Sequence, residues 1–441
     1  MTQYLLRFSF PLNIFLLLTV TLGPVKAQET GRVDPLPEPL TLDYALSLAN
    51  EAYPDVDIAQ ADLAIAEAVR MQAESLTGFN ASLIGRASWI QPPEIAPDQS
   101  HGDHSISFFI YKRLYDFGRS GATQNAADAE VKHTEWSLME ARNQRRIQIM
   151  QHYFDVLLAD LKYARDNEAM AVAYISYDRA RDRNKLGQVS DIGVLEEQSN
   201  YQEVRRQRYQ SEAKQRIVRA RLANILNRPG KLPATLVPPE LPENKRQLPE
   251  VDELISQGLE HNPVLLALKE QVNAAEERVR AARTYYRPVI DGEAQVSAYS
   301  REMANHNVWS ATIIVDVPLY TSGAVRSKVL KQEAELQKQK SLLSKKEMEV
   351  QQAILETWLE LDTLKAKQQE VRVLRDYRDL YLDRSRALYE MEVKADLGDA
   401  MVQTSEAKLR VVATEFQISL AWARLDALLG APLREGKGLT Q

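Results

Sequence analysis

The chain has 441 residues, no cysteine, and 61 acidic against 55 basic side chains, for a formal net charge of −6. A hydrophobic content of 44% is enough for a folded protein, and no basic stripe of the kind that nucleic acid requires is present. The lack of cysteine excludes disulfides, thiolate metal sites, thiol catalysis and the lipid attachment point of an exported lipoprotein.

The N-terminus predicts a cleaved export signal over residues 1–27. A basic start is followed by an apolar segment at 8–22, and Val25 and Ala27 are small residues at the positions that a signal peptidase inspects. The alternative is an N-terminal membrane anchor, which is disfavoured because the apolar segment is short and contains a proline and an asparagine. No later stretch approaches eighteen consecutive apolar residues, so we expect any membrane crossing to be made by strands.

After an N-terminal linker, the sequence contains two similar copies of one pattern. Pro54 aligns with Pro263, and the hinge "LYDFG" that ends at Gly118 aligns with "LYTSG" that ends at Gly323. Tyr153 and Trp358 stand at the same offset beyond these hinges. A duplication of this extent predicts two tandem structural repeats. The predicted segments are a linker at 28–40, repeat 1 at 41–228, a proline-rich linker at 229–250, repeat 2 at 251–432 and a C-terminal tail at 433–441.

Each repeat contains two segments in which apolar and polar residues alternate, which is the pattern of a strand with two unlike faces. We expect strands at about 79–91, 104–115, 289–300 and 307–319. Each is close to the length that a tilted strand needs to cross a bilayer. The alternative is a pair of ordinary hairpins on a protein core, but the polar faces carry charges in mid-strand and no other segment resembles such a core. A spanning sheet must close, and four strands cannot do so, so several copies must pool their strands.

Beyond each hinge lies a run of about a hundred residues without proline, which predicts uninterrupted long helix. In the second run the apolar residues are separated by steps of 3, 4 or 7, as in a coiled-coil seam. They are Val350, Ile354, Leu361, Leu364, Val371, Leu374, Tyr381 and Leu388. A helix from Ala324 to near Val393 would be about 100 Å long.

These features together resemble the TolC-like outer-membrane efflux proteins. The resemblance is carried by the duplication, by Asn262-Pro263 with its counterpart Tyr53-Pro54, and by the "PLYxxG" hinge at 318–323. It implies a mainly α-helical fold with a membrane β-barrel portion, in which three protomers give four strands each to a shared twelve-stranded barrel. The long helices would form an α-barrel across the periplasm of a Gram-negative cell envelope.

The resemblance also implies a function and its partners. The chain would be a homotrimeric exit channel in the outer membrane, in contact with membrane lipid, a periplasmic adaptor and an inner-membrane transporter. No cofactor is implied. The sequence holds no HExxH, phosphate-binding glycine loop or G-x-S-x-G motif, so we expect no enzyme activity. The alternative function is a soluble periplasmic coiled-coil interaction protein.

Candidate functional residues follow from this assignment. The hinge residues are Gly118, Pro318 and Gly323, of which glycine is suited to a left-handed conformation. Candidates for the barrel lumen are Arg86, Asp291, Glu293 and Asp316. Candidates for a pore constriction are Asp396 and Asp399, with Asp191 at the equivalent position of repeat 1.

These assignments have alternatives. The lumen candidates could instead be ordinary solvated side chains without a role in transport. Asp396 and Asp399 match the Asp-x-x-Asp of some family members by spacing, but an ungapped alignment places Gly398 at the first aspartate, and both acids could instead lie at a helix N-terminus. The loop residues Asp98, His101, Asp103 and His104 have the chemistry of metal ligands, but exposed loops commonly have this composition. We therefore expect no metal site.

Overall fold

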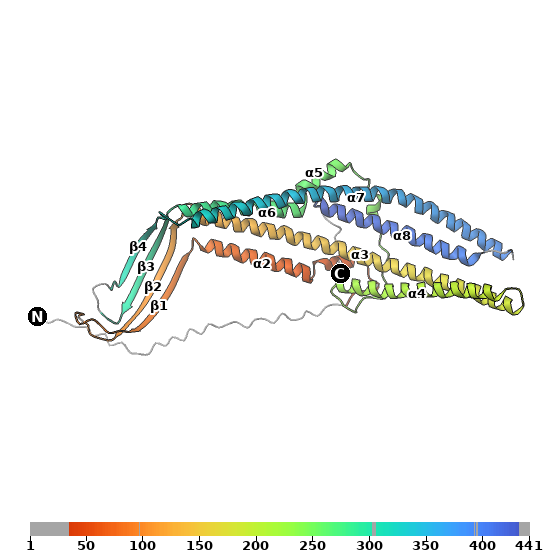
Figure 1. The fold of residues 1–441 in the computed structure, drawn as a ribbon, viewed down its shortest axis with the longest axis horizontal. Helices are drawn as coiled ribbons and strands as arrows, with labels where there is room; N and C mark the ends of the chain where they lie inside the picture. Colours follow the sequence, from red (N-terminus) through yellow and green to blue (C-terminus); the bar gives the residue numbers. More distant parts are fainter. Residues whose placement is uncertain (1–34, 97, 302–305, 392, 394–395, 432–441) are drawn as a thin grey trace.

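The computed structural model describes residues 35–96, 98–301, 306–391, 393 and 396–431. The predicted export signal at 1–27, most of the linker at 28–40 and the tail at 433–441 lie outside the described residues. Within them the molecule is elongated, with a four-stranded sheet at one end and long helices that run away from it (Figure 1).

The same series of elements occurs twice. The first is α2 (Pro54–Ser75), β1 (Phe79–Trp89), β2 (Gly102–Tyr115), α3 (Arg119–Lys185) and α4 (Asp191–Ile225). The second is α6 (Pro263–Arg283), β3 (Val289–Tyr299), β4 (Trp309–Asp316), α7 (Ala324–Glu390) and α8 (Leu397–Leu428). Short elements accompany them: α1 (Leu42–Ser47), η1 (Leu48–Asn50), η2 (Pro242–Lys245), α5 (Val251–His261) and η3 (Thr284–Tyr286). This is the mainly α-helical fold with four strands that the sequence predicts.

The helix predicted from Ala324 to near Val393 is confirmed as α7 (Ala324–Glu390), but the expectation that each whole proline-free run is one uninterrupted helix is wrong. α3 and α7 have 67 residues each, about 100 Å at 1.5 Å per residue, but the chain then turns back into α4 and α8. No proline is needed for the first turn, because Gly187 adopts a left-handed φ of 72° and the Gln188 N–H donates to the Arg183 carbonyl oxygen. Ser190 then caps α4 by accepting from the Gly193 N–H at 3.2 Å.

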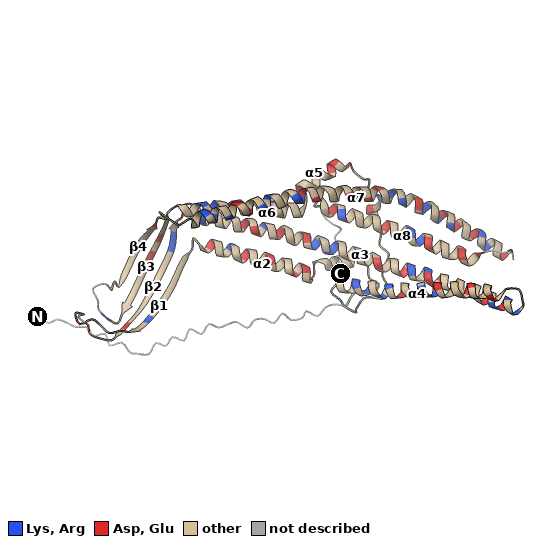
Figure 2. Ribbon diagram, in the orientation of Figure 1, with Lys and Arg blue, Asp and Glu red and all other residues tan. Residues whose placement is uncertain are grey.

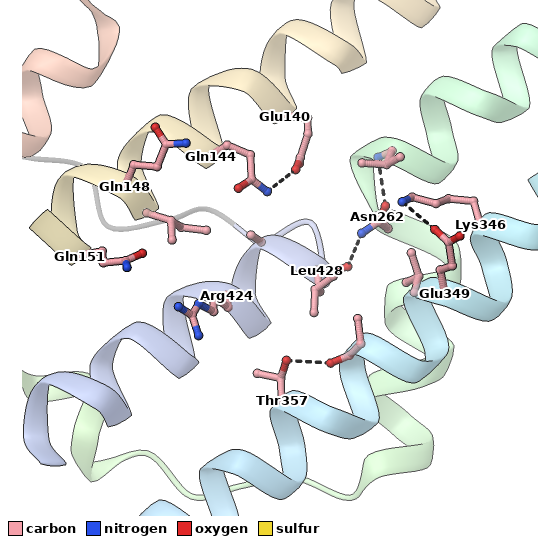
Figure 3. Close-up of a pocket in the computed structure, with 15 residues that line it drawn as sticks. Glu140, Gln144, Gln148, Gln151, Asn262, Lys346, Glu349, Thr357, Arg424 and Leu428 are labelled. Carbon is pink, nitrogen blue, oxygen red and sulfur yellow. Dashed lines mark hydrogen bonds and ion pairs between the residues drawn. The ribbon is translucent and has the colours of Figure 1, made fainter. Parts of the chain in front are cut away.

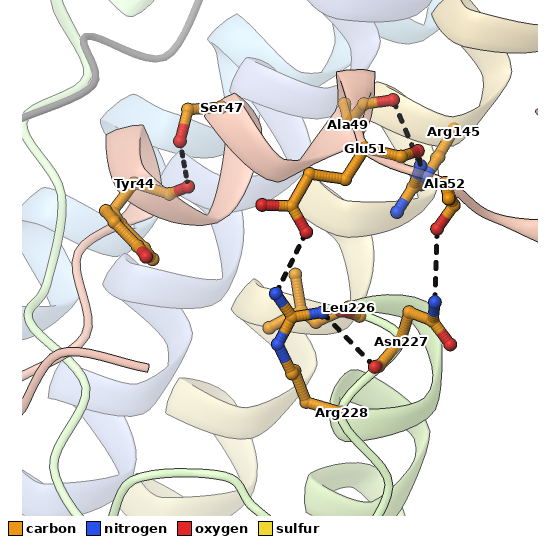
Figure 4. Close-up of polar contacts among 9 residues, drawn as sticks. All are labelled: Tyr44, Ser47, Ala49, Glu51, Ala52, Arg145, Leu226, Asn227 and Arg228. Carbon is orange, nitrogen blue, oxygen red and sulfur yellow. Dashed lines mark hydrogen bonds and ion pairs between the residues drawn. The ribbon is translucent and has the colours of Figure 1, made fainter. Parts of the chain in front are cut away.

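Helices α4 and α2 abut end to end, and so do α8 and α6. Each of these two pairs spans the length of a long helix, α3 or α7. At the α4–α2 junction, the Asn227 side chain donates to the Ala52 carbonyl oxygen at 3.1 Å, as Figure 4 shows. At the α8–α6 junction, Asn262 donates to the Leu428 carbonyl oxygen at 2.9 Å, as Figure 3 shows. The helical layer is thus ordered α2/α4, α3, α6/α8, α7.

Two apolar clusters at these junctions hold the layer together. One includes Leu42, Tyr153, Phe154 and Phe416, and the other includes Ile354, Leu361 and Trp422. Tyr153 and Trp358 make equivalent contacts in the two repeats, because each side chain donates a hydrogen bond to a carbonyl oxygen of the proline-rich linker. The Tyr153 hydroxyl lies 2.6 Å from the Val237 carbonyl oxygen, and the Trp358 Nε1 lies 2.9 Å from that of Pro249.

Candidate channel wall and gate

The sheet is antiparallel, ordered β1-β2-β3-β4, and open at both edges within the described residues. Its ends differ slightly from the predicted ones: β2 begins at Gly102, and β4 covers only Trp309–Asp316. β4 stops two residues before Pro318, which has no N–H for a ladder bond. Among the described residues, no helix lies over either face of the sheet (Figure 1).

The strand register brings all four lumen candidates to one face. Paired residues of neighbouring strands share a face, and the register pairs Arg86 with Ser105 and Ser105 with Tyr299. Asp291 and Glu293 lie on that same face of β3, because side chains alternate along a strand. Asp316 joins them, since it pairs with Val289.

Polar contacts link the strands across this face. Arg113 of β2 donates from Nε to the Asp291 carboxylate at 3.2 Å. Further along the same two strands, the Ser297 hydroxyl donates to that of Ser107 at 2.8 Å, and the Gln295 amide donates to Ser297 at 2.6 Å. The face is therefore organised by its own hydrogen bonds and does not need a protein layer above it.

The opposite face is apolar and exposed. Leu83 of β1, Trp309 and Ile313 of β4 are 70%, 72% and 71% exposed. Charged residues are rare in the strands and frequent along the helices, as Figure 2 shows. An exposed apolar patch of this kind is an interaction surface rather than an ordinary protein exterior.

The two hinges share one backbone geometry. Gly118 precedes α3 with a φ of 90°, and Gly323 precedes α7 with a φ of 82°. The residue before each glycine, Phe117 or Ser322, is also left-handed, with φ values of 55° and 50°. Two successive left-handed residues turn the chain sharply from strand to helix. In repeat 1 the buried Asp116 secures the turn by accepting from the Ser120 N–H at 2.9 Å.

The candidate gate acids lie at the starts of helices, at the end of the molecule remote from the sheet (Figure 1). Asp396 is the N-cap of α8 and accepts from the Asp399 N–H at 3.4 Å. Asp191 is the first residue of α4, and its carboxylate accepts from Asn184 at 2.9 Å. Asp396 therefore makes a helix-capping contact, and the role of the three acids in a pore stays a prediction. Gly398 lies against α3, because a Cβ there would stand 2.8 Å from the Val172 side chain.

A cavity of about 580 Å³ with both polar and apolar lining residues lies at the α8–α6 junction (Figure 3). Glutamines of α3, among them Gln144 and Gln148, line it opposite residues of α7 and α8. Glu140 also lines it and accepts from Gln144 at 2.7 Å. Burial raises the pKa of Glu140 above its ordinary value of 4.5, against the lowering effects of Gln144 and Lys346.

Repeat 1 has a different polar arrangement at its junction. Arg145 of α3 is fully buried and donates to the Ala49 carbonyl oxygen at 3.2 Å, as Figure 4 shows. Its guanidinium carbon also lies 4.5 Å from the centroid of the Tyr53 ring. Burial lowers the pKa of Arg145. Beside it, Arg228 and Glu51 form an ion pair at 2.9 Å. Sequence reasoning missed these residues, since a single arginine in a long helix has no distinctive pattern.

Among the described residues, no group of three or more His, Cys, Asp or Glu side chains is placed to hold a metal ion. None of the helices described combines the length and the apolar character that a membrane crossing requires.

Comparison with known proteins identifies the fold. The chain superposes on CusC, in a structure concerned with transmembrane channel formation, with a TM-score of 0.72 and 16% identity over 89% of this chain and 92% of that chain. It superposes on the outer membrane protein VceC of Vibrio cholerae with a TM-score of 0.73 and 16% identity, over 89% of this chain and 97% of that one. The molecule therefore has the fold of the outer-membrane channel proteins.

Sequence comparison identifies the family. Residues 254–431 match the outer membrane efflux protein family, and this match confirms the resemblance found in the sequence. The matched segment lies within repeat 2. Protein CyaE of Bordetella pertussis is 23% identical over 261 residues, which are 58% of this chain and 55% of that protein. The chain thus spans about half the length of this relative.

Proposed function

We propose that this protein is the outer-membrane exit channel of a tripartite efflux or secretion system. Three copies would pool their strands into a twelve-stranded barrel, and their helices would continue it as a tunnel across the periplasm. A periplasmic adaptor and an inner-membrane transporter would deliver the cargo, and the transporter would supply the energy.

One observation carries this proposal: an open sheet with one exposed apolar face, one polar face and two unpaired edges. Backbone groups at a sheet edge must be paired in lipid, so a bilayer accepts such a sheet only when it is closed. Pairing of β4 with β1 of the next copy would close it, with the apolar face toward lipid. Arg86, Asp291, Glu293 and Asp316 would then line the lumen.

The gate assignment rests on the same arrangement. The helix tips lie at the end remote from the sheet, so threefold symmetry would gather three copies of Asp396, Asp399 and Asp191 around the periplasmic entrance. Carboxylates in such a ring raise the local negative potential and favour cation occupancy.

The test is fractionation of cells followed by planar-bilayer recording on the purified full-length protein. We expect the protein in the outer-membrane fraction until detergent is added, as a trimer that forms discrete conducting channels. Release by osmotic shock as a non-conducting species would instead support a soluble periplasmic interaction protein.

A further inference from the structure

Where the sheet joins the helices, two cations lie beside one aromatic ring. The Cζ of Arg119, the first residue of α3, is 3.9 Å from the centroid of the Tyr285 ring. The Nζ of Lys328, in the first turns of α7, is 3.4 Å from the same centroid. Arg119 also donates to the Thr284 carbonyl oxygen at 3.2 Å. Three elements that are far apart in the sequence, α3, η3 and α7, thus bring these side chains together.

These two cations lack the acidic partner that a neighbouring cation has. Arg278 pairs with Glu130 at 2.6 Å. In the described part of the chain, neither Arg119 nor Lys328 forms an ion pair with a carboxylate. Lys328, chiefly through a hydrogen bond, and Arg119 lower the pKa of Tyr285 below its ordinary value of 10, against the effect of burial. The cluster therefore carries uncompensated positive charge, and an anion would be the missing partner.

A pocket of about 410 Å³ opens beside this cluster. Tyr285 and Lys328 line it together with residues of α2, α3 and α6, and many of these are small or apolar, among them Val69, Leu76 and Ala281. Pockets of this size commonly hold small organic molecules. Apolar walls next to uncompensated cations fit a ligand that has an apolar body and one acidic group.

The pocket lies on the side of the helical layer that continues the polar face of the sheet. Arg113, which pairs with Asp291 on that face, is near enough to Tyr285 to help lower its pKa. Around α3, Tyr153 contacts the proline-rich linker and lies about 140° from Glu130, which lines the pocket. The pocket therefore faces away from the linker, and in the proposed channel it would open into the tunnel.

We propose that Arg119, Lys328 and Tyr285 form a binding site for small organic anions on the tunnel wall, with the adjacent pocket holding the apolar part of the ligand. Arg119 has more N–H donors than Thr284 uses, and the Lys328 ammonium is a further donor. Both can donate charge-assisted hydrogen bonds to a carboxylate, sulfonate or phosphate group. The inference rests on the proposed function, because it identifies organic anions as a class of cargo.

Binding of 1-naphthalenesulfonate to the purified full-length protein in detergent tests the site, since this probe joins an aromatic body to a permanent negative charge. Isothermal titration calorimetry, corrected with protein-free detergent, measures the affinity. We expect saturable binding, and at least tenfold weaker binding of the neutral 1-naphthalenemethanol. Equal affinities of the two probes for the wild type, or no saturable binding of the sulfonate, would overturn the site. This comparison does not depend on the folding of any variant.

A charge variant with a matched control locates the anionic group. Lys328→Gln should weaken binding of 1-naphthalenesulfonate at least tenfold, because it removes a charge-assisted hydrogen bond. The control is Arg326→Gln, which removes an exposed cation from the same helix about 160° around its axis from Lys328. The control should change the affinity less than twofold. An equal loss in both variants would indicate diffuse attraction to a positive surface and would overturn the site.

A second variant fills the pocket and keeps both cations. Ala281→Met should weaken binding of 1-naphthalenesulfonate at least fivefold, and an unchanged affinity would overturn the pocket as the place where the apolar body binds. Planar-bilayer conductance of the wild type tests the proposed function separately. A conducting trimer that does not bind the probe overturns the site alone. A protein that binds the probe without conducting keeps the site and overturns the claim that its ligand is cargo.

Discussion

Single residues show how the two repeats make the same junction with different side chains. In repeat 1, Asn227 follows α4 with a left-handed φ of 55° and bonds across to Ala52. In repeat 2 the equivalent position is Gly430, where a Cβ would stand 2.2 Å from the His261 carbonyl oxygen. The amide has moved to the other side of the junction, to Asn262, which also caps α6 by accepting from Val264 and Leu265. In a sequence alignment of the two repeats, the loss of one asparagine and the gain of the other look like two unrelated differences.

Glu140 should make stability depend on pH. Burial raises its pKa in the folded state, so the unfolded chain loses this proton first as the pH rises above about 4.5, and stability falls. Glu140→Gln removes the effect and keeps a partner for Gln144. As the pH rises from 4 to 7, we expect the free energy of unfolding of this variant to increase relative to that of the wild type. Chemical denaturation in detergent measures both.

The control for this prediction has the opposite sign. The pKa of the half-exposed Glu335 is lowered by hydrogen bonds from Gln339 and Lys338, so its contribution to stability is present above about pH 4.5 and lost below it. Glu335→Gln should therefore lose stability relative to the wild type over the same pH range. Parallel pH profiles for Glu140→Gln and the wild type would contradict the prediction.

The candidate gate is best tested by removing charge while keeping the helix caps. Asp396→Asn with Asp399→Asn preserves an oxygen that can cap α8, whereas alanine at position 396 would also cost about 1 kcal/mol of cap energy. We expect the double asparagine variant to show higher single-channel conductance and weaker block by divalent cations in planar bilayers. Unchanged conductance and block would remove both residues from the gate.

At the scale of elements, the hinge joins the second strand of each repeat to its long helix. The glycines were predicted from the sequence, and their φ values of 90° and 82° give the reason. The left-handed Phe117 and Ser322 were not predicted, because neither residue type signals that conformation. The turns at the helix tips were missed for a related reason: glycine and capping residues can end a helix as proline does.

Gly118→Ala should destabilise the protein through backbone conformation alone. No atom lies within 4 Å of the position that a Cβ would occupy, but the left-handed φ would cost about 1–2 kcal/mol. The matched control is Gly121→Ala, three residues later inside α3, where a Cβ also meets nothing. The control should gain about 0.5–1 kcal/mol, because alanine favours helix. Thermal unfolding of the two variants in detergent distinguishes these signs.

At the scale of the whole molecule, a single chain leaves large surfaces uncovered. Its sheet has no protein cover among the described residues, and large apolar side chains remain exposed on both lateral helices. Burial of apolar surface is the main favourable term in folding, so surfaces of this size are expected to be covered by lipid or by other copies.

The two faces of the sheet should respond oppositely to a new charge. Leu83→Lys places an ammonium on the apolar face of β1, which would cost about 2–4 kcal/mol at the bilayer midplane. Ser82→Lys places the same group on the polar face, one residue away. We expect the first variant to lose stable incorporation into the outer membrane and the second to retain it, as measured by fractionation and by trimer yield. Equal incorporation would contradict the assignment of the faces.

The sequence by itself determined the local features of this protein. Alternation determined the strands to within a few residues, glycine determined the hinges, and the proline-free runs determined the mainly helical class, because each depends on residues close together in the chain. The channel class came from the resemblance to the TolC-like outer-membrane efflux proteins. Only the tertiary structure decided that the seam residues of α7 pack against α5, α6 and α8, and that Arg113 of β2 pairs with Asp291 of β3. Those outcomes depend on partners far away in the sequence, which periodicity within one segment does not specify.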